Sequence, residues 1–501
     1  MELFHLYALC AILIVVSSLY LRFFFAGSRR NLPPGPRPLP LVGNLLDLGA
    51  HPHRSLARLA ARHGPLMAVR LGAVTTVVAS SADAARDVLQ RHDAAFSTRS
   101  VPDAARACAH DEHSMGWLPP GSSRWRALRK VCSAELFAPQ RLDAHQALRR
   151  DKVQRLVSHV AGLARQGAAV DVRRVAFTTA LNLLSCTILS ADLADLDDRG
   201  ASGEFMEVIE EFPVAVGAPN LSDFFPAIAP LDPQRLRARL VRVFKKLHAI
   251  FDEQIERRMQ ERAAGDPPKN DFLDLLLDYR GAEDGRGFDR QTLLSLLTDL
   301  FTAGTDTSAA TIEWAMAELL QSPSSMAKAR AELAQALGPK QEIEETDIGQ
   351  LKYLQAIVKE TFRLHPPAPL LLPRQADTTT EIRGYTVPKG ARVLVNVWAI
   401  GRDRELWAEP DQFMPERFLE MEKEIDFRGR DFELVPFGSG RRICPGLPLA
   451  ARMVHLMLST LLHRFEWRLP ADMERKGVDM SENFGVTLGM STPLQAIAKP
   501  I

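Results

Sequence analysis

Phe437-Gly438-Ser439-Gly440-Arg441-Arg442-Ile443-Cys444-Pro445-Gly446 places one cysteine in a loop of glycines and arginines, directly before an apolar helical run over residues 447–462. The start of a helix offers unpaired backbone N–H groups and the positive end of the helix dipole, and both stabilise a thiolate. Cys444 is therefore predicted to bind a metal. A buried structural cysteine beside a turn is the simpler alternative, but it leaves the rest of the pattern unexplained.

A second unusual stretch, Phe301-Thr302-Ala303-Gly304-Thr305-Asp306-Thr307, lies inside an otherwise apolar helix predicted over residues 290–321. Glycine in a helix interior costs about 1 kcal/mol relative to alanine, and Asp and Thr compete for the backbone hydrogen bonds. One explanation is a glycine at a helix crossing with threonines bonded back to the helix. The other is an opened helix that leaves room for O2 and water, with Thr307 and Asp306 handling protons.

A third motif is a pair of opposite charges, Glu360 and Arg363, three residues apart on a helix predicted over residues 351–365. Residues at this spacing share a helix face and can form an ion pair. Pro366 and Pro367 then end the helix. Such a pair is usually solvent-exposed, so its significance depends on its position between the other two motifs.

Taken together, and in their order along the chain, these motifs resemble those of the cytochromes P450. The resemblance covers essentially the whole chain and is closest to plant microsomal members that oxidise terpenoids, the group holding geraniol hydroxylases, ferruginol synthase and grass ent-cassadiene hydroxylases. It implies a mainly α fold with a small β region and haem b (iron protoporphyrin IX) as cofactor. By this resemblance Cys444 is the fifth ligand of the haem iron, and a thiolate in that position favours O–O cleavage.

The resemblance also implies roles for other residues. The oxygen-activation motif would consist of Ala303, Gly304, Asp306 and Thr307. Residues expected at the haem itself are Trp125, Arg129, Arg374, Phe437, Arg442 and Gly446, of which Trp125, Arg129, Arg374 and Arg442 would reach the propionates and Phe437 the ring. A buried ionic network on the proximal side would join Glu360, Arg363 and Arg417.

From the residues alone, the loop around Cys444 carries three further expectations. Gly440 and Gly446 would take positive φ or let the backbone approach a flat ring closely. Pro445 would suit the first position of the following helix. Arg442 would offer a fixed positive charge.

The N-terminus reads as a membrane anchor over residues 1–30, because residues 3–21 are almost wholly apolar and the positive charges follow them. A cleaved signal peptide is the alternative. Residues 31–40 are rich in proline and are expected to form a stiff hinge, followed by a catalytic domain over residues 41–501. The expected location is the endoplasmic reticulum membrane, single-pass, with the catalytic domain facing the cytosol.

The composition fits a large globular enzyme: the chain has 501 residues, 46% hydrophobic and 25% charged. The net charge of +1 gives no support for nucleic-acid binding. Five scattered cysteines indicate no disulfide framework. Periodicity predicts helices over residues 56–62, 82–92, 125–137, 144–166, 235–263, 290–321, 326–337 and 351–365. Strands are predicted as a hairpin of residues 67–71 and 75–79 around Gly72, then over residues 381–388, 392–397 and within 487–498.

The implied reaction inserts one oxygen atom of O2 into a C–H bond while the other leaves as water. No G-x-G-x-x-G fingerprint is evident in the sequence, so the electrons must come from a partner. The expected partner is NADPH–cytochrome P450 reductase, with cytochrome b5 as a further candidate, docking near Cys444 against basic residues such as Arg126, Lys130 and Arg441.

The substrate is expected to be a small apolar molecule, because the segments that the resemblance assigns to the pocket are largely apolar. These segments cover residues 101–120, 212–219, 297–305, 367–372 and 484–488, with Leu118, Val214, Val216, Phe301, Ala368, Leu370, Leu371, Phe484 and Val486 as wall residues. The first choice is a diterpene of plant defence metabolism such as ent-cassadiene, or a monoterpene such as geraniol. Alternatives are a phenolic, alkaloid or xenobiotic substrate, a reductase-independent isomerase or dehydratase, and a haem protein that only binds a ligand.

Overall fold

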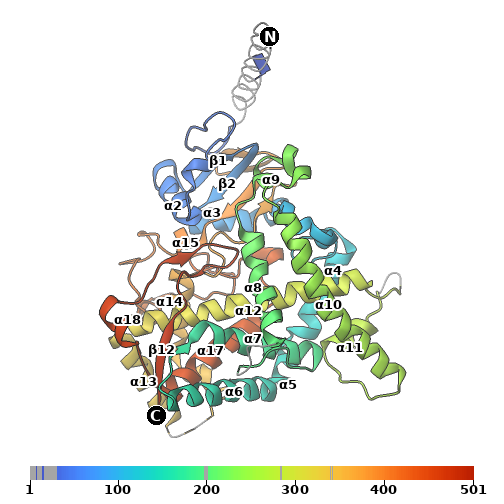
Figure 1. Ribbon diagram of the computed structural model, residues 1–501. Helices are drawn as coiled ribbons and strands as arrows, with labels where there is room; N and C mark the ends of the chain where they lie inside the picture. The colour runs from blue at the N-terminus through green and yellow to red at the C-terminus, as the bar shows by residue number, and fades with distance from the viewer. Residues whose placement is uncertain are drawn as a thin grey trace.

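Helix α12 (Arg290–Gln321) runs through the middle of the molecule, and the other helices pack around it (Figure 1). The structure is a computed structural model that describes residues 31–196, 201–281, 285–338, 340 and 342–501, together with residues 7, 14 and 15. α12 begins at a good cap, since the Asp289 side chain accepts a hydrogen bond from the Thr292 N–H at 2.7 Å. The expected fold class, mainly α with a small β region, is confirmed.

The other α-helices of the described residues follow in chain order. They are α2 (Pro52–His63), α3 (Ala82–Arg86), α4 (Ser123–Val131), α5 (Pro139–Ala144), α6 (Gln146–Arg165), α7 (Val172–Leu189), α8 (Ala201–Gly217), α9 (Leu221–Phe224), α10 (Leu236–Ala263), α11 (Phe272–Asp278), α13 (Pro323–Leu337), α14 (Lys352–Leu364), α15 (Val397–Ile400), α16 (Arg417–Glu420), α17 (Leu447–Arg464) and α18 (Ala471–Lys476). Short 3₁₀ or π segments are η1 (Leu45–Asp47), η2 (Asp87–Arg91), η3 (Asp93–Phe96), η4 (Asp103–Glu112), η5 (Cys132–Leu136), η6 (Pro226–Leu231), η7 (Asp347–Gln350) and η8 (Gly440–Arg442).

The strands form small sheets, the largest in the order β1-β2-β8-β5-β3. They are β1 (Leu66–Leu71), β2 (Val74–Ala79), β3 (Thr98–Arg99), β4 (Val170–Asp171), β5 (Arg374–Gln375), β6 (Thr380–Ile382), β7 (Tyr385–Val387), β8 (Arg392–Val395), β9 (Phe465–Arg468), β10 (Glu482–Asn483), β11 (Gly489–Met490) and β12 (Gln495–Pro500). The hairpin predicted around Gly72 is confirmed, since β1 and β2 pair antiparallel with Leu66 opposite Ala79. The single strand predicted over residues 381–388 is instead the hairpin of β6 and β7.

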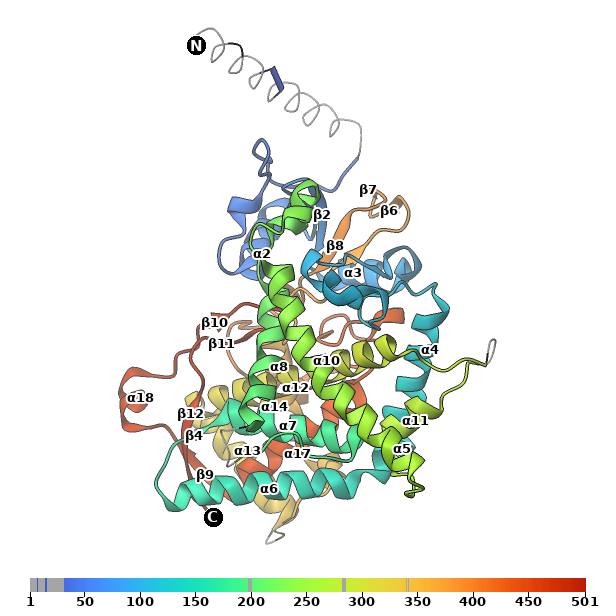
Figure 2. The same cartoon turned by 45° about the vertical axis from the view of Figure 1, so that its right-hand side comes forward.

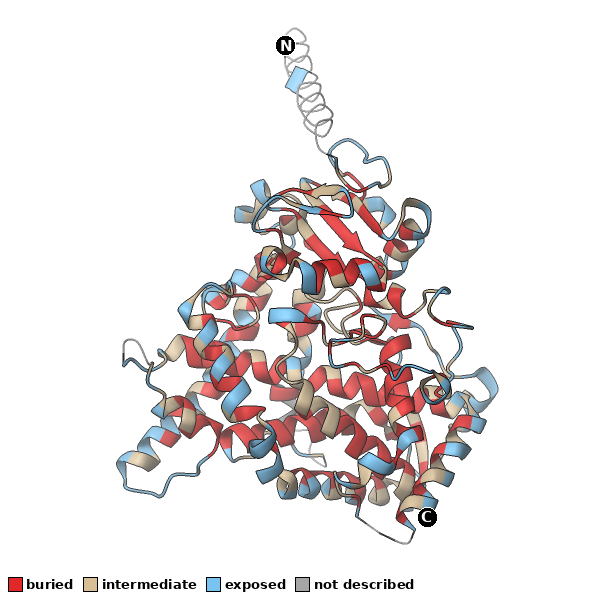
Figure 3. Cartoon of the chain, turned by 180° about the vertical axis from the view of Figure 1, so that it is seen from behind, coloured by how far each residue is buried: buried red, intermediate tan, exposed pale blue. Residues whose placement is uncertain are grey.

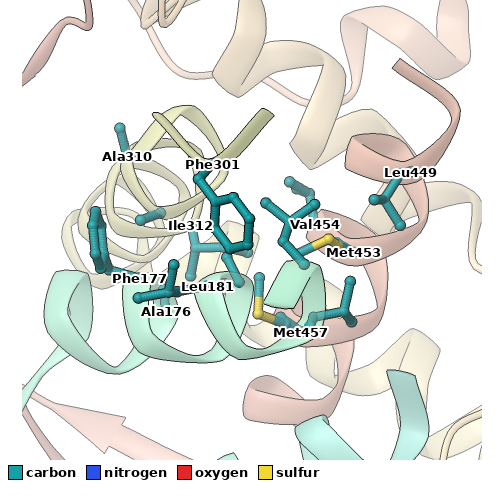
Figure 4. Packing of buried hydrophobic residues seen from close by; sticks show 14 of the residues in the cluster. Ala176, Phe177, Leu181, Phe301, Ala310, Ile312, Leu449, Met453, Val454 and Met457 are labelled. Carbon is teal, nitrogen blue, oxygen red and sulfur yellow. The ribbon is translucent and has the colours of Figure 1, made fainter. Parts of the chain in front are cut away.

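The core gathers where α7, α12 and α17 meet, and Figure 4 shows their apolar side chains interlocking. α7 contributes Phe177 and Leu181, α12 contributes Ile312, and α17 contributes Met453 and Met457. Figure 3 shows that α12 is buried along most of its length. A buried central helix is what can hold reactive side chains at fixed positions away from water.

Two predicted helices end in π turns, and two of the long observed helices were not predicted, nor were several helices of seven residues or fewer. Residues 82–92 and 125–137 are helical at first and continue as η2 and η5. α7 and α8 were missed. α7 is buried nearly all round, so it lacks the polar stripe by which helical periodicity is recognised.

Two segments, α7 and the predicted N-terminal anchor, bear on whether the chain spans a membrane. Among the described residues, α7 is the one helix long and apolar enough to cross a bilayer, but 83% of it is buried inside the molecule, as expected for a core helix. The anchor predicted over residues 1–30 lies outside the described residues, apart from residues 7, 14 and 15.

The proline-rich segment lies alongside β1, in the blue region at the top of Figure 1. The Ala68 N–H donates to the Pro34 carbonyl at 2.9 Å. A side chain at Gly35 would come within 1.8 Å of the Ala68 carbonyl oxygen, so only glycine permits this approach. The segment is therefore fixed to the catalytic part by backbone contacts as well as stiffened by its prolines.

Candidate functional site

The loop that holds Cys444 is shaped by glycines. Gly438 and Gly440 have φ angles of 69° and 71°, the left-handed region that glycine adopts without strain. A Cβ at Gly440 would lie 2.3 Å from the Leu89 carbonyl oxygen, so the loop packs directly on η2. The Cys444 N–H donates to the Phe437 carbonyl at 3.0 Å, which closes the loop.

The Cys444 thiol is half-buried at the start of α17. Burial raises the pKa of this thiol, while the backbone N–H groups of Gly446 and Leu447 and the charge of Arg129 act in the opposite direction. Without a metal the balance keeps the group protonated, and a coordinated metal ion would remove the proton. The sulfur thus has the electropositive surroundings that a thiolate ligand requires.

Two details of the loop differ from the sequence reading. Gly446 has a φ of −79°, and a Cβ there would lie 3.8 Å from the Cys444 Sγ, an ordinary contact distance, so its backbone does not demand glycine. The proline in the first turn of α17 is Pro448, whereas Pro445 stands before the helix cap. The expected positive φ of Gly446 and the expected place of Pro445 as first helical residue are therefore wrong, while the approach of Gly446 to a flat ring stays a prediction.

Beside the loop lies a cluster of arginines, Arg99, Arg129, Arg374 and Arg442, which we call the arginine cluster. Arg442 is buried and donates only to carbonyls, those of Ser97, Met115 and Leu118. Arg374 is buried and reaches the Asp93 carboxylate at 3.4 Å.

Arg99, which the sequence reading missed, is 9% exposed and donates to the Leu372 carbonyl at 2.7 Å. The buried Nε atoms of Arg99 and Arg374 have no hydrogen-bond partner among the described residues. No motif marks Arg99 in the sequence, so only the folded chain reveals it.

Among the described residues this cluster of four arginines has one carboxylate partner, Asp93, which Arg374 reaches at 3.4 Å. Burial, followed by the charges of the other three arginines, holds the pKa of Arg99 well below its usual range. Burial and the neighbouring arginines likewise lower the pKa of Arg442 to about 10. Arg129 makes no hydrogen bond within the described part of the chain, and burial lowers its pKa too. Buried cations without anions are unfavourable, so the cluster is suited to bind a ligand with carboxylates.

Haem b fits this arrangement. Its two propionates would supply the missing negative charge and would accept hydrogen bonds from the unpartnered arginine nitrogens. The half-buried Cys444 sulfur beside Arg129 would supply the axial ligand. The assignment of haem b rests on the chemistry of these groups, one thiol and four guanidinium groups, more than on any one distance.

Trp125 and Phe437, both predicted at the haem, have partners within the chain. Trp125 donates from Nε1 to the Met115 carbonyl at 3.2 Å, and its ring lies 4.8 Å from the Arg442 guanidinium carbon. Trp125 therefore supports Arg442 through a cation–π contact. Phe437 packs against Phe362, with ring centroids 5.3 Å apart, and remains half-buried.

A stripe of accessible side chains runs along α12 although this helix lies inside the molecule. Ala303 is exposed, and Asp299, Gly304 and Thr307 are partly exposed. Positions 299, 303 and 307 share one helix face because they are four residues apart. Accessible atoms on a buried helix mean that the interior holds space beside this face, and we call it the α12 stripe.

α12 is not opened at this stripe. An opened helix was one of the two explanations for residues 301–307. α12 is helical from Arg290 to Gln321, and the Thr307 hydroxyl donates to the Ala303 carbonyl at 2.9 Å. A Cβ at Gly304 would lie 2.7 Å from the Leu184 Cδ1 of α7. Gly304 is thus explained by a close helix crossing, while Ala303 and Thr307 still face the interior space.

The sequence analysis missed the partner of Asp306, which is Arg173 of α7. Asp306 is 3% exposed and forms a salt bridge with Arg173, which also pairs with Glu313 at 3.2 Å. Burial acts to lower the pKa of Arg173, but the two carboxylates outweigh it and raise the pKa. Asp306 is therefore held as a buried, charge-paired carboxylate one residue from Thr307.

The predicted network of Glu360, Arg363 and Arg417 is confirmed. Arg363 donates to both Glu360 oxygens at 2.7 Å, and Arg417 donates to one of them at 3.1 Å. All three side chains are buried. Arg363 also donates to the carbonyls of Gly401, Pro410 and Gln412, so it fixes the loops after α15.

One predicted wall residue, Phe301, does not face the interior space. Phe301 is fully buried between Phe205 and Phe251, with ring centroids 6.1 and 5.1 Å away. Val214 is 51% exposed. Other predicted wall positions, among them Leu370, Leu371, Phe484 and Val486, are partly exposed.

Comparisons with known proteins give a family and several similar proteins. A family model described as Cytochrome P450 matches residues 33–493. The chain is 48% identical over 478 residues to geraniol 8-hydroxylase of Swertia mussotii, covering 95% of each chain. It is 45% identical over 471 residues to ferruginol synthase of Salvia miltiorrhiza, covering 94% of each chain. It is 47% identical over 481 residues to carnosic acid synthase of Rosmarinus officinalis, covering 95% of this chain and 94% of the relative.

Proposed function

Because the chain belongs to the cytochrome P450 family, we propose that it hydroxylates a terpenoid, with Cys444 as the ligand of the haem iron. It is a monooxygenase with haem b as cofactor. When bound, the haem activates O2 and directs one oxygen atom into a C–H bond, while the other leaves as water. The observation that carries the site is the cluster of four buried or half-buried arginines, with Asp93 as its one carboxylate partner among the described residues, beside a cysteine at the start of α17.

The proposal divides the work among this chain's residues. Cys444 would provide the thiolate, while Arg99, Arg129, Arg374 and Arg442 would bind the propionates. Arg99 is an addition to the residues inferred from the sequence. The apolar side chains around the α12 stripe would exclude bulk water.

The proton path would use Thr307 and Asp306 on α12. The Thr307 hydroxyl now donates to the Ala303 carbonyl, and its oxygen keeps lone pairs that can accept a proton donor from the interior space. Asp306 is held in place by its salt bridge with Arg173 and would relay protons toward Thr307. Ala303, with its small side chain on the α12 stripe, would leave space for O2 beside these groups, whereas Gly304 would let α12 pack closely on α7.

The terpenoid class is supported by the relatives, whose names refer to geraniol, ferruginol and carnosic acid. The partly exposed apolar residues Leu370, Leu371 and Val486 are consistent with an apolar substrate. Members of this family receive electrons from a separate redox protein and act on apolar substrates. For this chain we propose NADPH–cytochrome P450 reductase as that protein, with cytochrome b5 as an additional donor.

We further propose that residues 1–30 anchor the chain in the endoplasmic reticulum membrane, that residues 31–40 form the hinge, and that residues 41–501 form the catalytic domain on the cytosolic side. The contact of Pro34 with β1 would then orient the catalytic part relative to the bilayer. Glycan attachment at Asn220 would contradict this orientation, and that side chain is 2% exposed.

A ligand test separates this proposal from a structural role for Cys444. The reduced protein, purified with haem, should show with carbon monoxide the absorption band typical of thiolate-bound haem. Cys444→Ser should lose that band, whereas Cys186→Ser, at another half-buried cysteine, should keep it. Retention of the band in Cys444→Ser would overturn the ligand assignment.

A turnover test addresses the reaction. Protein reconstituted with the reductase should convert geraniol or a diterpene to a hydroxylated product only when NADPH is present. Turnover without NADPH would favour an isomerase or dehydratase. Conversion of phenolics or alkaloids with no activity on any terpenoid would refute the substrate class.

A further inference from the structure

Residues 114–118, between η4 and α4, connect α12 with the arginine cluster, and we call this segment the 114–118 turn. The N–H groups of Trp117 and Leu118 donate to the Ser114 carbonyl at 3.2 and 3.0 Å, which closes a single tight turn. Figure 2 shows α4 near the N-terminal end of α12, as does Figure 1, and Arg124 of α4 pairs with Asp289 at the cap of α12. The turn therefore lies where α12 and α4 approach each other.

The first part of the turn is held by Asp299 of α12. The Ser114 hydroxyl donates to this carboxylate at 2.8 Å to each oxygen, and the Gly116 N–H donates to it at 3.4 Å. The Nε2 atom of the buried His110 lies 3.2 Å from the Asp299 Oδ1, so the carboxylate is also enclosed from the side of η4. Hydrogen bonds to a carboxylate are stronger than those between neutral groups. Asp299 therefore fixes the turn to α12.

The other contact of the turn is with Arg442, a member of the arginine cluster. Its Nη1 donates to the Met115 carbonyl at 3.2 Å, and its Nη2 donates to the Leu118 carbonyl. The indole of Trp125 donates to the same Met115 carbonyl at 3.2 Å. The Arg442 Nε donates to the Ser97 carbonyl at 2.7 Å. A guanidinium has five N–H groups, so these three bonds leave two of them for a propionate.

The direction of those two N–H groups depends on the turn. A guanidinium is planar, and both carbonyls that hold its Nη atoms belong to residues 114–118. Ser114 is 0% exposed. Without the carboxylate, its hydroxyl and the Gly116 N–H would lose their acceptor in the interior, which is unfavourable and favours a rearranged turn. A rearranged turn would move the carbonyls that orient Arg442.

We propose that Asp299 is a positioning residue for the haem, because it holds Arg442, through the 114–118 turn, in the orientation that binds a propionate. This inference rests on the proposed assignment of the arginine cluster to the haem propionates. Asp299 lies on the α12 stripe, two helical turns before Thr307. The helix that carries the oxygen-activation motif thus also fixes one of the groups that hold the cofactor.

The rate of haem loss tests this role. The haem-loaded full chain would be mixed with an excess of haem-free myoglobin as acceptor, and the transfer followed by absorption. Asp299→Ala should speed haem loss by about tenfold, as expected when a hydrogen bond to a charged group is weakened. Ser114→Ala removes the link without changing any charge and should act in the same direction. Asp299→Asn keeps an oxygen that accepts from the Ser114 hydroxyl and should recover part of the effect.

A double-mutant cycle separates positioning from general stability. Arg442→Ala should itself speed haem loss, and adding Asp299→Ala should then change the rate by less than about twofold, because Asp299 acts through Arg442. Asn182→Ala is the matched control. The Asn182 side chain of α7 also holds a loop, accepting from the N–H groups of Leu193 and Ala194 at 3.2 and 3.0 Å. This variant should unfold at lower urea concentration but lose haem at the wild-type rate.

The other outcomes would overturn the proposal. Unchanged haem loss in Asp299→Ala and Ser114→Ala, with faster loss in Arg442→Ala, would refute the positioning role alone. Full additivity of Asp299→Ala and Arg442→Ala would show that the carboxylate acts independently of the arginine. Equally fast loss in Asn182→Ala would assign the effect to general destabilisation.

Two further results keep the test decisive. Wild-type haem loss in Arg442→Ala would refute the propionate assignment of Arg442 and the positioning role with it. If Asp299→Ala does not fold, Ser114→Ala takes its place in the cycle, with the same expected non-additivity.

Discussion

Arg173 illustrates how one residue outside the recognised motifs can control a proposed catalytic group. It lies in the first turn of α7 and pairs with Asp306 and Glu313 of α12, both nearly inaccessible to solvent. Removing one member of a buried charge group leaves the others uncompensated, which costs about 3–5 kcal/mol. Burial already raises the pKa of Glu313, with Arg173 opposing that rise. Arg173 is thus a positioning residue for the proton path.

Arg173→Ala should lower both stability and the fraction of NADPH oxidation that yields product. Loss of the cation raises the pKa of a carboxyl group, because the charged form loses its partner. The acidic limb of the pH–rate profile should therefore move to higher pH. Arg173→Lys should restore part of the effect, and Arg174→Ala, at a neighbour without a carboxylate partner among the described residues, should leave the profile unchanged. An unshifted profile in Arg173→Ala would show that Arg173 has only a structural role.

At this scale the sequence was informative where residues belong to compact motifs. The Glu360 network was predicted correctly, and Cys444 and Thr307 could be proposed as site residues, because the spacing within each motif is local. Arg99 was not found, because an isolated arginine reveals nothing until folding places it near Arg374 and Arg442. Asp299 was passed over for the same reason, since its partners lie in a segment 183 residues or more away along the chain.

At the scale of elements, the crossing of α7 and α12 determines how the oxygen-activation motif is held. Gly304 lets the Leu184 side chain of α7 lie against the α12 backbone. The two helices bury Phe177, Leu181 and Ile312 between them and α17 (Figure 4). A small residue at the crossing is therefore a packing requirement, independent of the space it leaves on the stripe.

Gly304→Ala should destabilise the protein by up to about 2 kcal/mol, since overpacking costs about 1–3 kcal/mol and the better helix propensity of alanine returns about 1 kcal/mol. In a Leu184→Ala background the clash is absent, so the same change should become stabilising. Urea unfolding followed by circular dichroism would measure both. Gly162→Ala on α6, where a Cβ meets nothing within 4 Å, should stabilise in either background. Equal effects of Gly304→Ala in the two backgrounds would refute the packing explanation.

The elements that sequence reasoning missed share a cause. α7 is apolar all round because it is enclosed by neighbours, so no periodic pattern distinguishes it. The π turns η2 and η5 follow regular helices without any sequence break. Amphipathic helices such as α14, by contrast, were predicted to within a few residues, because one face meets the core and the other meets polar surroundings.

At the scale of the whole molecule, the fold class followed from the family resemblance more than from periodicity. Long helices with few strands would also describe many unrelated α-rich proteins. The assembly of distant segments around α12 was beyond local pattern, as the sheet shows: β2 pairs in parallel with β8, more than three hundred residues later in the chain. The predicted membrane anchor lies outside the described residues and stays a prediction.

We expect the redox partner to dock on the exposed basic surface of α4. α4 carries Arg129 and Trp125 toward the arginine cluster, while Arg126 and Lys130 on the same helix are exposed. An acidic partner would be attracted to this surface, and the electrons would then enter close to Cys444. Exposed charges act mainly on association and are screened by salt.

Arg126→Glu combined with Lys130→Glu should raise the reductase concentration needed for half-maximal turnover by about tenfold at low salt, and by less at high salt. The carbon monoxide spectrum should not change, because neither side chain belongs to the arginine cluster. Lys476→Glu on α18, at the opposite side of the molecule in Figures 1 and 2, reverses an exposed charge as well and should have little effect. If the α18 variant were impaired as strongly as the α4 variant, overall charge would explain the loss and the partner would have to dock elsewhere.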